Sequence, residues 1–150
     1  MLRRVRDRIA GERGFTLIEL LVVIVIIGIL AAIALPQFFV HRDKAEDADA
    51  KTDVRSLSTL VEGCYATELD FTRCDEESEY GAESNLDIGT APGDVYVSDS
   101  DVGSYTITAI SKGNVGGQHN FLLTRASMGS AAERTCTPTG KGGCPASGNW

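Results

Sequence analysis

Glu19 is the residue of this sequence whose chemistry is most unusual for its surroundings. It precedes residues 20–35, an uninterrupted apolar run with the sequence LLVVIVIIGILAAIAL. A carboxylate in a membrane-spanning segment costs about 1–3 kcal/mol, depending on depth, and is usually functional. If the chain is cut after Gly14, Phe15 gains a cationic amine four residues before Glu19. The helix dipole favours a carboxylate in the first turn, where it could pair with the amine of a neighbouring parallel helix.

The cysteines form the second chemical group, and they are Cys64, Cys74, Cys136 and Cys144. In an exported segment four cysteines favour disulfides, and three pairings are open. Pairing Cys64 with Cys74 and Cys136 with Cys144 is the local choice. Each bond then closes a loop of about ten residues and contributes about 2.5–3 kcal/mol. A zinc site is not expected, because there is no C-x-x-C pair and the only histidines are His41 and His119, both expected at the surface.

The remaining polar residues do not indicate an enzyme. No Ser/His/Asp spacing, metal signature or phosphate-binding loop is present, so neither catalysis nor a cofactor is expected. Three carboxylates could approach a calcium site but lack a full ligand loop, and a solvated turn is the better interpretation of Asp94, Asp99 and Asp101. A second acidic group reads as an exposed loop, and it comprises Asp75, Glu76, Glu77 and Glu79.

Charge and apolarity are distributed very unevenly along the 150 residues. Residues 1–14 carry five arginines and two acidic residues, a net of +3, and the remainder has 9 basic and 19 acidic residues, a net of −10. The apolar stretch 15–35 would form a helix about 31 Å long, close to the bilayer thickness. A basic segment before one apolar helix predicts a cytoplasmic N-terminus and an exported remainder. The acidic remainder disfavours nonspecific nucleic-acid binding.

Hydropathy alone leaves three interpretations of this N-terminus. An ordinary secretory signal would be cut after Ala34, leaving Leu35 at the mature end. An uncleaved anchor would retain Met1 and hold a small exported domain. Neither needs a charge at Glu19, which favours the third interpretation, cleavage after Gly14.

Residues 13–38, RGFTLIELLVVIVIIGILAAIALPQF, resemble the class III signal and N-terminal helix of type IV pilins and their pseudopilin relatives. The resemblance implies that a prepilin peptidase cuts between Gly14 and Phe15 and methylates the new amine of Phe15. It also implies that Glu19 guides subunit docking and that Pro36 is the proline that kinks the long helix. Proline removes a helical hydrogen bond, which independently predicts a kink there.

The elements behind these residues predict an α+β fold. One helix is expected over about residues 15–67, apolar in 15–36 and amphipathic in 37–67, with an apolar stripe that includes Val54, Leu57, Val61 and Cys64. Its charged residues, from Arg42 to Arg55, are expected on a solvated face. Strands are predicted at residues 94–98, 104–111, 120–125 and 134–137. The predicted organisation is thus a leader (1–14), a membrane helix (15–36), its continuation (37–67) and an antiparallel head (68–150). Many pilins have a similar disulfide-bounded C-terminal loop.

The resemblance implies a structural subunit that moves from the cytoplasmic membrane, head outward, into an extracellular pilus. Its implied partners are other pilin subunits, the prepilin peptidase, the inner-membrane assembly machinery and, before assembly, lipid. A type II secretion pseudopilin is the main alternative, and the four cysteines favour a pilus because major pseudopilins tend to lack cysteines. A DNA-capturing pilin and a plain membrane-anchored domain are further alternatives, the first disfavoured by the acidic charge.

Overall fold

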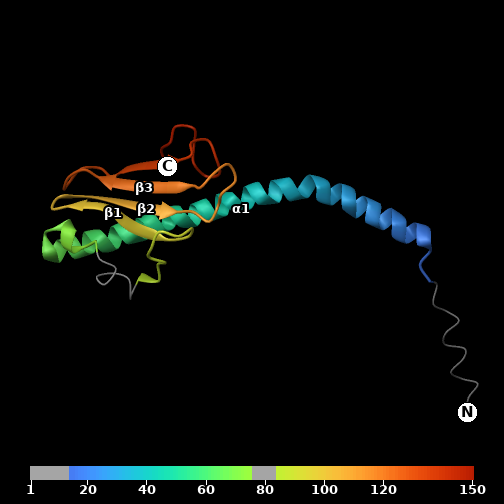
Figure 1. Cartoon of the computed structure of the whole chain (residues 1–150), viewed down its shortest axis with the longest axis horizontal. Coiled ribbons are helices and arrows are strands. Elements are labelled where there is room, and N and C mark those ends of the chain that lie inside the picture. The colour runs from blue at the N-terminus through green and yellow to red at the C-terminus, as the bar shows by residue number, and fades with distance from the viewer. Residues whose placement is uncertain (1–13, 76–83) are drawn as a thin grey trace, which may run out of the picture. The chain divides into compact units, whose positions relative to one another are not determined.

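The first element of the structure is a single long helix, α1 (Leu17–Glu68), of 52 residues. The computed structural model describes residues 14–75 and 84–150, which fall into two compact units divided between Gln37 and Phe38. The long helix and the head that follows confirm the predicted α+β fold (Figure 1).

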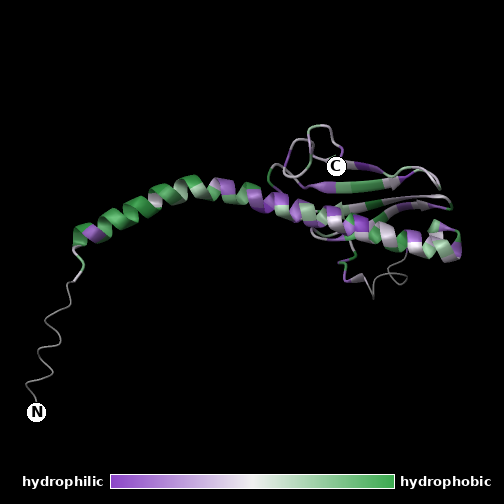
Figure 2. Ribbon diagram, turned by 180° about the vertical axis from the view of Figure 1, so that it is seen from behind, coloured by the Kyte–Doolittle hydropathy of each residue, from purple (hydrophilic) through white to green (hydrophobic). Residues whose placement is uncertain are grey.

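The first unit consists of the apolar part of α1. Its large hydrophobic side chains are all exposed, because no other described residue of this unit covers them. Hydropathy colouring shows this part of α1 almost entirely apolar, whereas the later turns alternate between polar and apolar residues (Figure 2). By length and composition α1 contains one segment able to cross a membrane, near the N-terminus. Pro36 lies inside α1 without ending it.

The second unit contains a four-stranded antiparallel sheet in the order β1-β2-β3-β4. Its strands are β1 (Val95–Asp101), β2 (Ser104–Ile110), β3 (Asn120–Arg125) and β4 (Glu133–Thr137). Each predicted strand is present, but β1 runs three residues further than expected and contains an irregularity between Val97 and Asp99. Asp99 and Asp101 therefore lie exposed on a strand, where the sequence suggested a solvated turn.

The core of the head lies between the sheet and the amphipathic part of α1. Every second residue along β2 and β3 faces the helix, as the two-residue period of a strand requires. The helix contributes Ala50, Val54, Leu57 and Val61, and the strands contribute Tyr105, Ile107, Ala109, Phe121 and Leu123, all buried. The predicted apolar stripe is confirmed, with Cys64 half-buried at its end.

An aromatic stack closes the core where α1 ends. The 3-10 helix η2 (Phe71–Arg73) follows the helix and places the Phe71 ring 4.2 Å from Tyr65 and 4.7 Å from Tyr105, measured between centroids. The Cys64–Cys74 disulfide ties η2 back to α1. Glu76, Glu77 and Glu79 of the predicted acidic loop lie outside the described residues.

Candidate assembly site

The side chains of Thr16 and Glu19 cap the N-terminus of α1. Thr16 donates a hydrogen bond from its backbone N–H (2.9 Å) and another from its hydroxyl (2.8 Å) to Glu19 Oε2. The Thr16 hydroxyl in turn accepts from the Glu19 N–H at 3.3 Å. This reciprocal pattern is a capping box, which satisfies N–H groups that no helical carbonyl can reach. Glu19 therefore caps the isolated helix, a role that the sequence analysis missed although T-x-x-E is its usual signature.

The predicted cleavage residues stand just before this cap. Gly14 and Phe15 are outside the helix, and Phe15 is 87% exposed. Nothing lies within 4 Å of the position that a Cβ on Gly14 would occupy. An exposed, non-helical peptide bond is the conformation in which a peptidase can bind a substrate chain.

The apolar surface after the cap contains only one charge. Between Phe15 and Val40 every residue other than Glu19 is uncharged. Gly28 has open space around it, so a second helix backbone can approach closely there. The arrangement provides a wide apolar surface for packing against lipid or other helices, with a carboxylate at one end.

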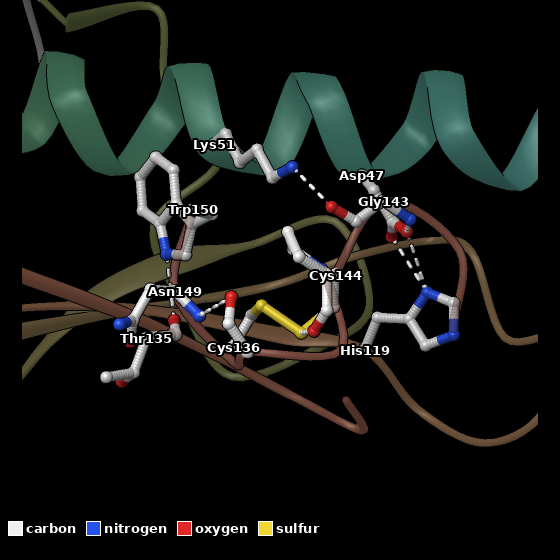
Figure 3. The surroundings of a disulfide bond; sticks show 11 residues. Asp47, Lys51, His119, Thr135, Cys136, Gly143, Cys144, Asn149 and Trp150 are labelled. Carbon is white, nitrogen blue, oxygen red and sulfur yellow. Dashed lines mark hydrogen bonds and ion pairs between the residues drawn. A yellow bond between two sulfur atoms is a disulfide. The ribbon is translucent and has the colours of Figure 1, made fainter. Parts of the chain in front are cut away.

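In the head, three charged residues spaced four apart along α1 bind loops distant in the sequence. Asp43 accepts a hydrogen bond from the Val115 N–H at 2.6 Å. Asp47 accepts from the Gly143 N–H at 2.6 Å, and Lys51 Nζ donates to the Gly143 carbonyl at 2.6 Å. The contacts of Asp47 and Lys51 hold the Cys136–Cys144 loop against the helix (Figure 3), and the contact of Asp43 holds the loop between β2 and β3.

His119 forms the centre of this network. Its Nδ1 lies 2.9 Å from both carboxylate oxygens of Asp47, and both side chains have no exposed surface. Its Nε2 is 3.3 Å from the Val115 carbonyl. The prediction that His119 lies on the surface is wrong, and so is the placement of Asp43 and Asp47 on a solvated face. Buried polar groups need partners, and loops 72 and 96 residues away supply them here.

Only glycine fits at position 142, because a side chain there would clash with Asp47 and His119. Its φ of +53° is in the left-handed region that favours glycine. A Cβ there would overlap Asp47 Oδ2 and stand 2.5 Å from His119 Cε1. The loop can therefore cover the buried Asp47–His119 hydrogen bond only if this position is glycine.

A second polar group lies at the other end of the core. The Tyr105 hydroxyl donates to Glu62 Oε1 at 2.7 Å, and Arg125 pairs with the same carboxylate. Burial, and then the hydrogen bond to Glu62, raise the pKa of Tyr105 from 10.0 to about 12. The group joins α1, β2 and β3 at the edge of the core, which is a structural role.

The two disulfides link Cys64 to Cys74 and Cys136 to Cys144, with Cα–Cα distances of 5.8 and 5.7 Å. This is the local pairing that the sequence favours. Within the described residues no group of three or more His, Cys, Asp or Glu is arranged to hold a metal ion.

The N-terminal segment matches a known sequence motif, and the chain is similar to several known proteins. The prokaryotic N-terminal methylation motif matches residues 9–35. The type IV major pilin protein PilA of Myxococcus xanthus is 42% identical over 81 residues, covering 54% of this chain and 32% of that protein. The chain therefore spans about a third of that relative's length. No solved structure matches the chain.

Other relatives match this chain over segments of different length. A fimbrial protein of Pseudomonas aeruginosa is 33% identical over 104 residues, covering 66% of this chain and 68% of that protein. The type II secretion system core protein G of the same species is 43% identical over 51 residues, 34% of this chain. A match of 104 residues is longer than α1, which has 52, so it includes part of the head. On this evidence, the chain belongs to the type IV pilin family.

Proposed function

We propose that this chain is the precursor of a type IV pilus subunit that is cut between Gly14 and Phe15, methylated at Phe15 and polymerised through residues 15–36. The observation that carries the proposal is the apolar surface of α1, fully exposed in the monomer and interrupted only by Glu19. Such a surface suits a bilayer before assembly and a bundle of helices afterwards, because both surroundings are apolar. The basic residues 3–13 favour a cytoplasmic N-terminus and an exported head.

Glu19 would gain a second partner on assembly. In the monomer its carboxylate accepts from Thr16, and in the filament it would also accept from the methylated amine of Phe15 in a neighbouring subunit. A carboxylate in apolar surroundings is costly alone and much less so beside a cation. The pair would therefore select the axial register of the subunits.

Substitutions at Glu19 separate its two roles. Glu19→Gln keeps the capping geometry, since glutamine also serves in capping boxes, but removes the charge. We expect Glu19→Gln and Glu19→Ala to be inserted and cleaved normally and to yield at least about tenfold fewer filaments, because the interhelical ion pair is lost. Thr16→Val weakens the cap while keeping the carboxylate, and should still assemble. Filament yield is measured by shearing and immunoblotting against the membrane-held pool.

The opposite pattern would contradict the docking role. Wild-type yield from Glu19→Gln together with poor yield from Thr16→Val would mean that Glu19 serves only as a cap.

A type II secretion pseudopilin is the second candidate, favoured by the similarity to core protein G. That similarity extends over 51 residues, no longer than α1 itself, whereas the fimbrial similarity continues into the head. The longer match favours a pilus subunit. Filaments that extend well beyond the cell surface would support the pilus, and a requirement for this chain in protein secretion without such filaments would support the pseudopilin.

A further inference from the structure

Trp150 lies close to two arginines at one edge of the head. The Arg55 guanidinium stands 5.1 Å and that of Arg134 5.7 Å from the centroid of the indole ring. The ring also packs edge-on against Phe121 at 5.9 Å, and its N–H donates to the Thr135 carbonyl at 2.8 Å (Figure 3). The indole is thus fixed in place, and it orients both cations.

The positive charges of these two arginines are available to a binding partner. Both are exposed, and neither forms a salt bridge within the described part of the chain. We call Arg55, Arg134 and Trp150 the basic flank. A stacked arginine remains able to donate to a carboxylate from its rim, which is why such residues often anchor protein interfaces.

A group of carboxylates lies on the other side of α1. Asp49 and Asp53 are one turn apart on the helix, and Asp87 precedes β1, its carbonyl accepting from the Val95 N–H at 2.9 Å. Burial, and then the charges of Asp49 and Asp87, raise the pKa of Asp53, while Lys112 acts against this shift. We call Asp49, Asp53 and Asp87 the acidic flank. None of the three appears in a salt bridge among the described residues, so their mutual repulsion is only partly relieved within the monomer.

The two flanks point away from each other. Ala50 and Val54 mark the line of α1 that faces the core, and in a helix the preceding residue and the following residue fall on opposite sides of that line. The basic flank adjoins β4 and the acidic flank adjoins the start of β1, and these are the opposite edges of the sheet.

We propose that in the assembled filament the basic flank of one head docks against the acidic flank of a second copy of this chain. A contact between two different surfaces of the same molecule leaves one surface free at each step, so it propagates into a helical polymer. The contact would offset part of the repulsion between subunits whose residues 15–150 carry a net charge of −10. That same net charge disfavours a polyanion as the occupant of the basic flank. This inference rests on the proposed function.

Paired charge reversals test the contact. Asp49→Lys/Asp53→Lys reverses the acidic flank, and Arg55→Glu/Arg134→Glu reverses the basic flank. Each should lower filament yield at least about tenfold, because like charges then face each other. The chain with all four substitutions has complementary flanks again and should recover to within about threefold of wild type. Asp99→Lys/Glu133→Lys is the matched control for the reversed acidic flank, because it makes the same change of net charge at exposed residues outside both flanks and should assemble normally.

A second measurement does not depend on folding after charge reversal. Arg134→Lys keeps the positive charge and offers an amine to a zero-length carbodiimide cross-linker. Filaments of this variant should give a cross-linked peptide that joins the introduced lysine to Asp49, Asp53 or Asp87 of a neighbouring subunit.

The results distinguish the two proposals. Absence of filaments from the wild type would overturn the proposed function itself. Wild-type filaments together with normal assembly of both reversed variants would overturn only the docking contact. The same holds if the fourfold variant stays as poor as either double variant, or if the lysine cross-links only within its own subunit. Normal assembly with lost binding of an anionic polymer by Arg55→Glu/Arg134→Glu would assign the basic flank to that polymer instead.

Discussion

Asp47 and His119 hold the C-terminal loop on the helix as a fully buried, hydrogen-bonded pair. Asp47 also accepts from Gly143, so removing its carboxylate leaves a buried imidazole and a buried N–H without their acceptor. We expect Asp47→Ala to lower the free energy of unfolding by about 2–5 kcal/mol, because two buried groups lose their hydrogen-bond partner. Denaturant unfolding of the full chain in detergent, followed by the fluorescence of its single tryptophan, measures this.

Asp99→Ala serves as the control for that experiment. Asp99 is an exposed aspartate on β1, and its removal should change stability by no more than about 0.5 kcal/mol. Equal stability of Asp47→Ala and Asp99→Ala would show that the buried pair does not hold the loop.

Because of Tyr105, the stability of the head should depend on pH in the alkaline range. Its pKa is raised to about 12 in the folded chain, from 10.0 for an ordinary tyrosine. The unfolded chain therefore releases this proton first, so the contribution to stability is complete below pH 10 and is lost as the pH rises toward 12. Tyr105→Phe has no such proton and should lose less stability between pH 10 and 12. Parallel stability–pH curves for the two proteins would contradict the assignment.

At the scale of elements, the C-terminal end of α1 contains local strain. Leu69, the first residue after the helix, has a φ of 57° and is 67% exposed, and its N–H donates to the Tyr65 carbonyl at 2.8 Å. A left-handed conformation is costly for leucine and easy for glycine. Leu69→Gly should therefore raise the free energy of unfolding by about 0.5–1 kcal/mol.

The matched comparison is a glycine inside the same helix. Thr67→Gly, two residues earlier, should lower stability by about 0.5–1 kcal/mol, because glycine there loses more conformational freedom. Destabilisation by both substitutions in the same denaturant experiment would argue against strain at Leu69.

The sequence predicted the elements well because their signals are local. The stripe from Val54 to Cys64 recurs at helical spacing, and on β2 and β3 alternate residues are buried. The hydrogen bond between Asp47 and His119 could not be predicted in this way, because the two residues are 72 positions apart. A charged residue between other charged residues gives no local sign that a loop will cover it. The Thr16–Glu19 cap is different, since its spacing was visible but the carboxylate was attributed to docking alone.

At the scale of the whole molecule, the two compact units have separate tasks. Among the described residues the apolar part of α1 has no internal partner, so it depends on a bilayer or on other subunits, whereas the head has its own core and two disulfides. The charged flanks lie only on the head. Helix packing would thus provide most of the cohesion of a filament, and the heads would contribute to the choice of neighbour.

Processing after Gly14 is the step on which all of this depends, and the mass of the N-terminal peptide tests it most directly. The chain is expressed with a prepilin peptidase, purified from the membrane and from sheared filaments, and digested. We predict a peptide that begins at Phe15 and carries one methyl group, and for Gly14→Val only uncut precursor. A peptide that begins at Leu35 would indicate ordinary secretion and one that begins at Met1 an uncleaved anchor, and either would contradict the account.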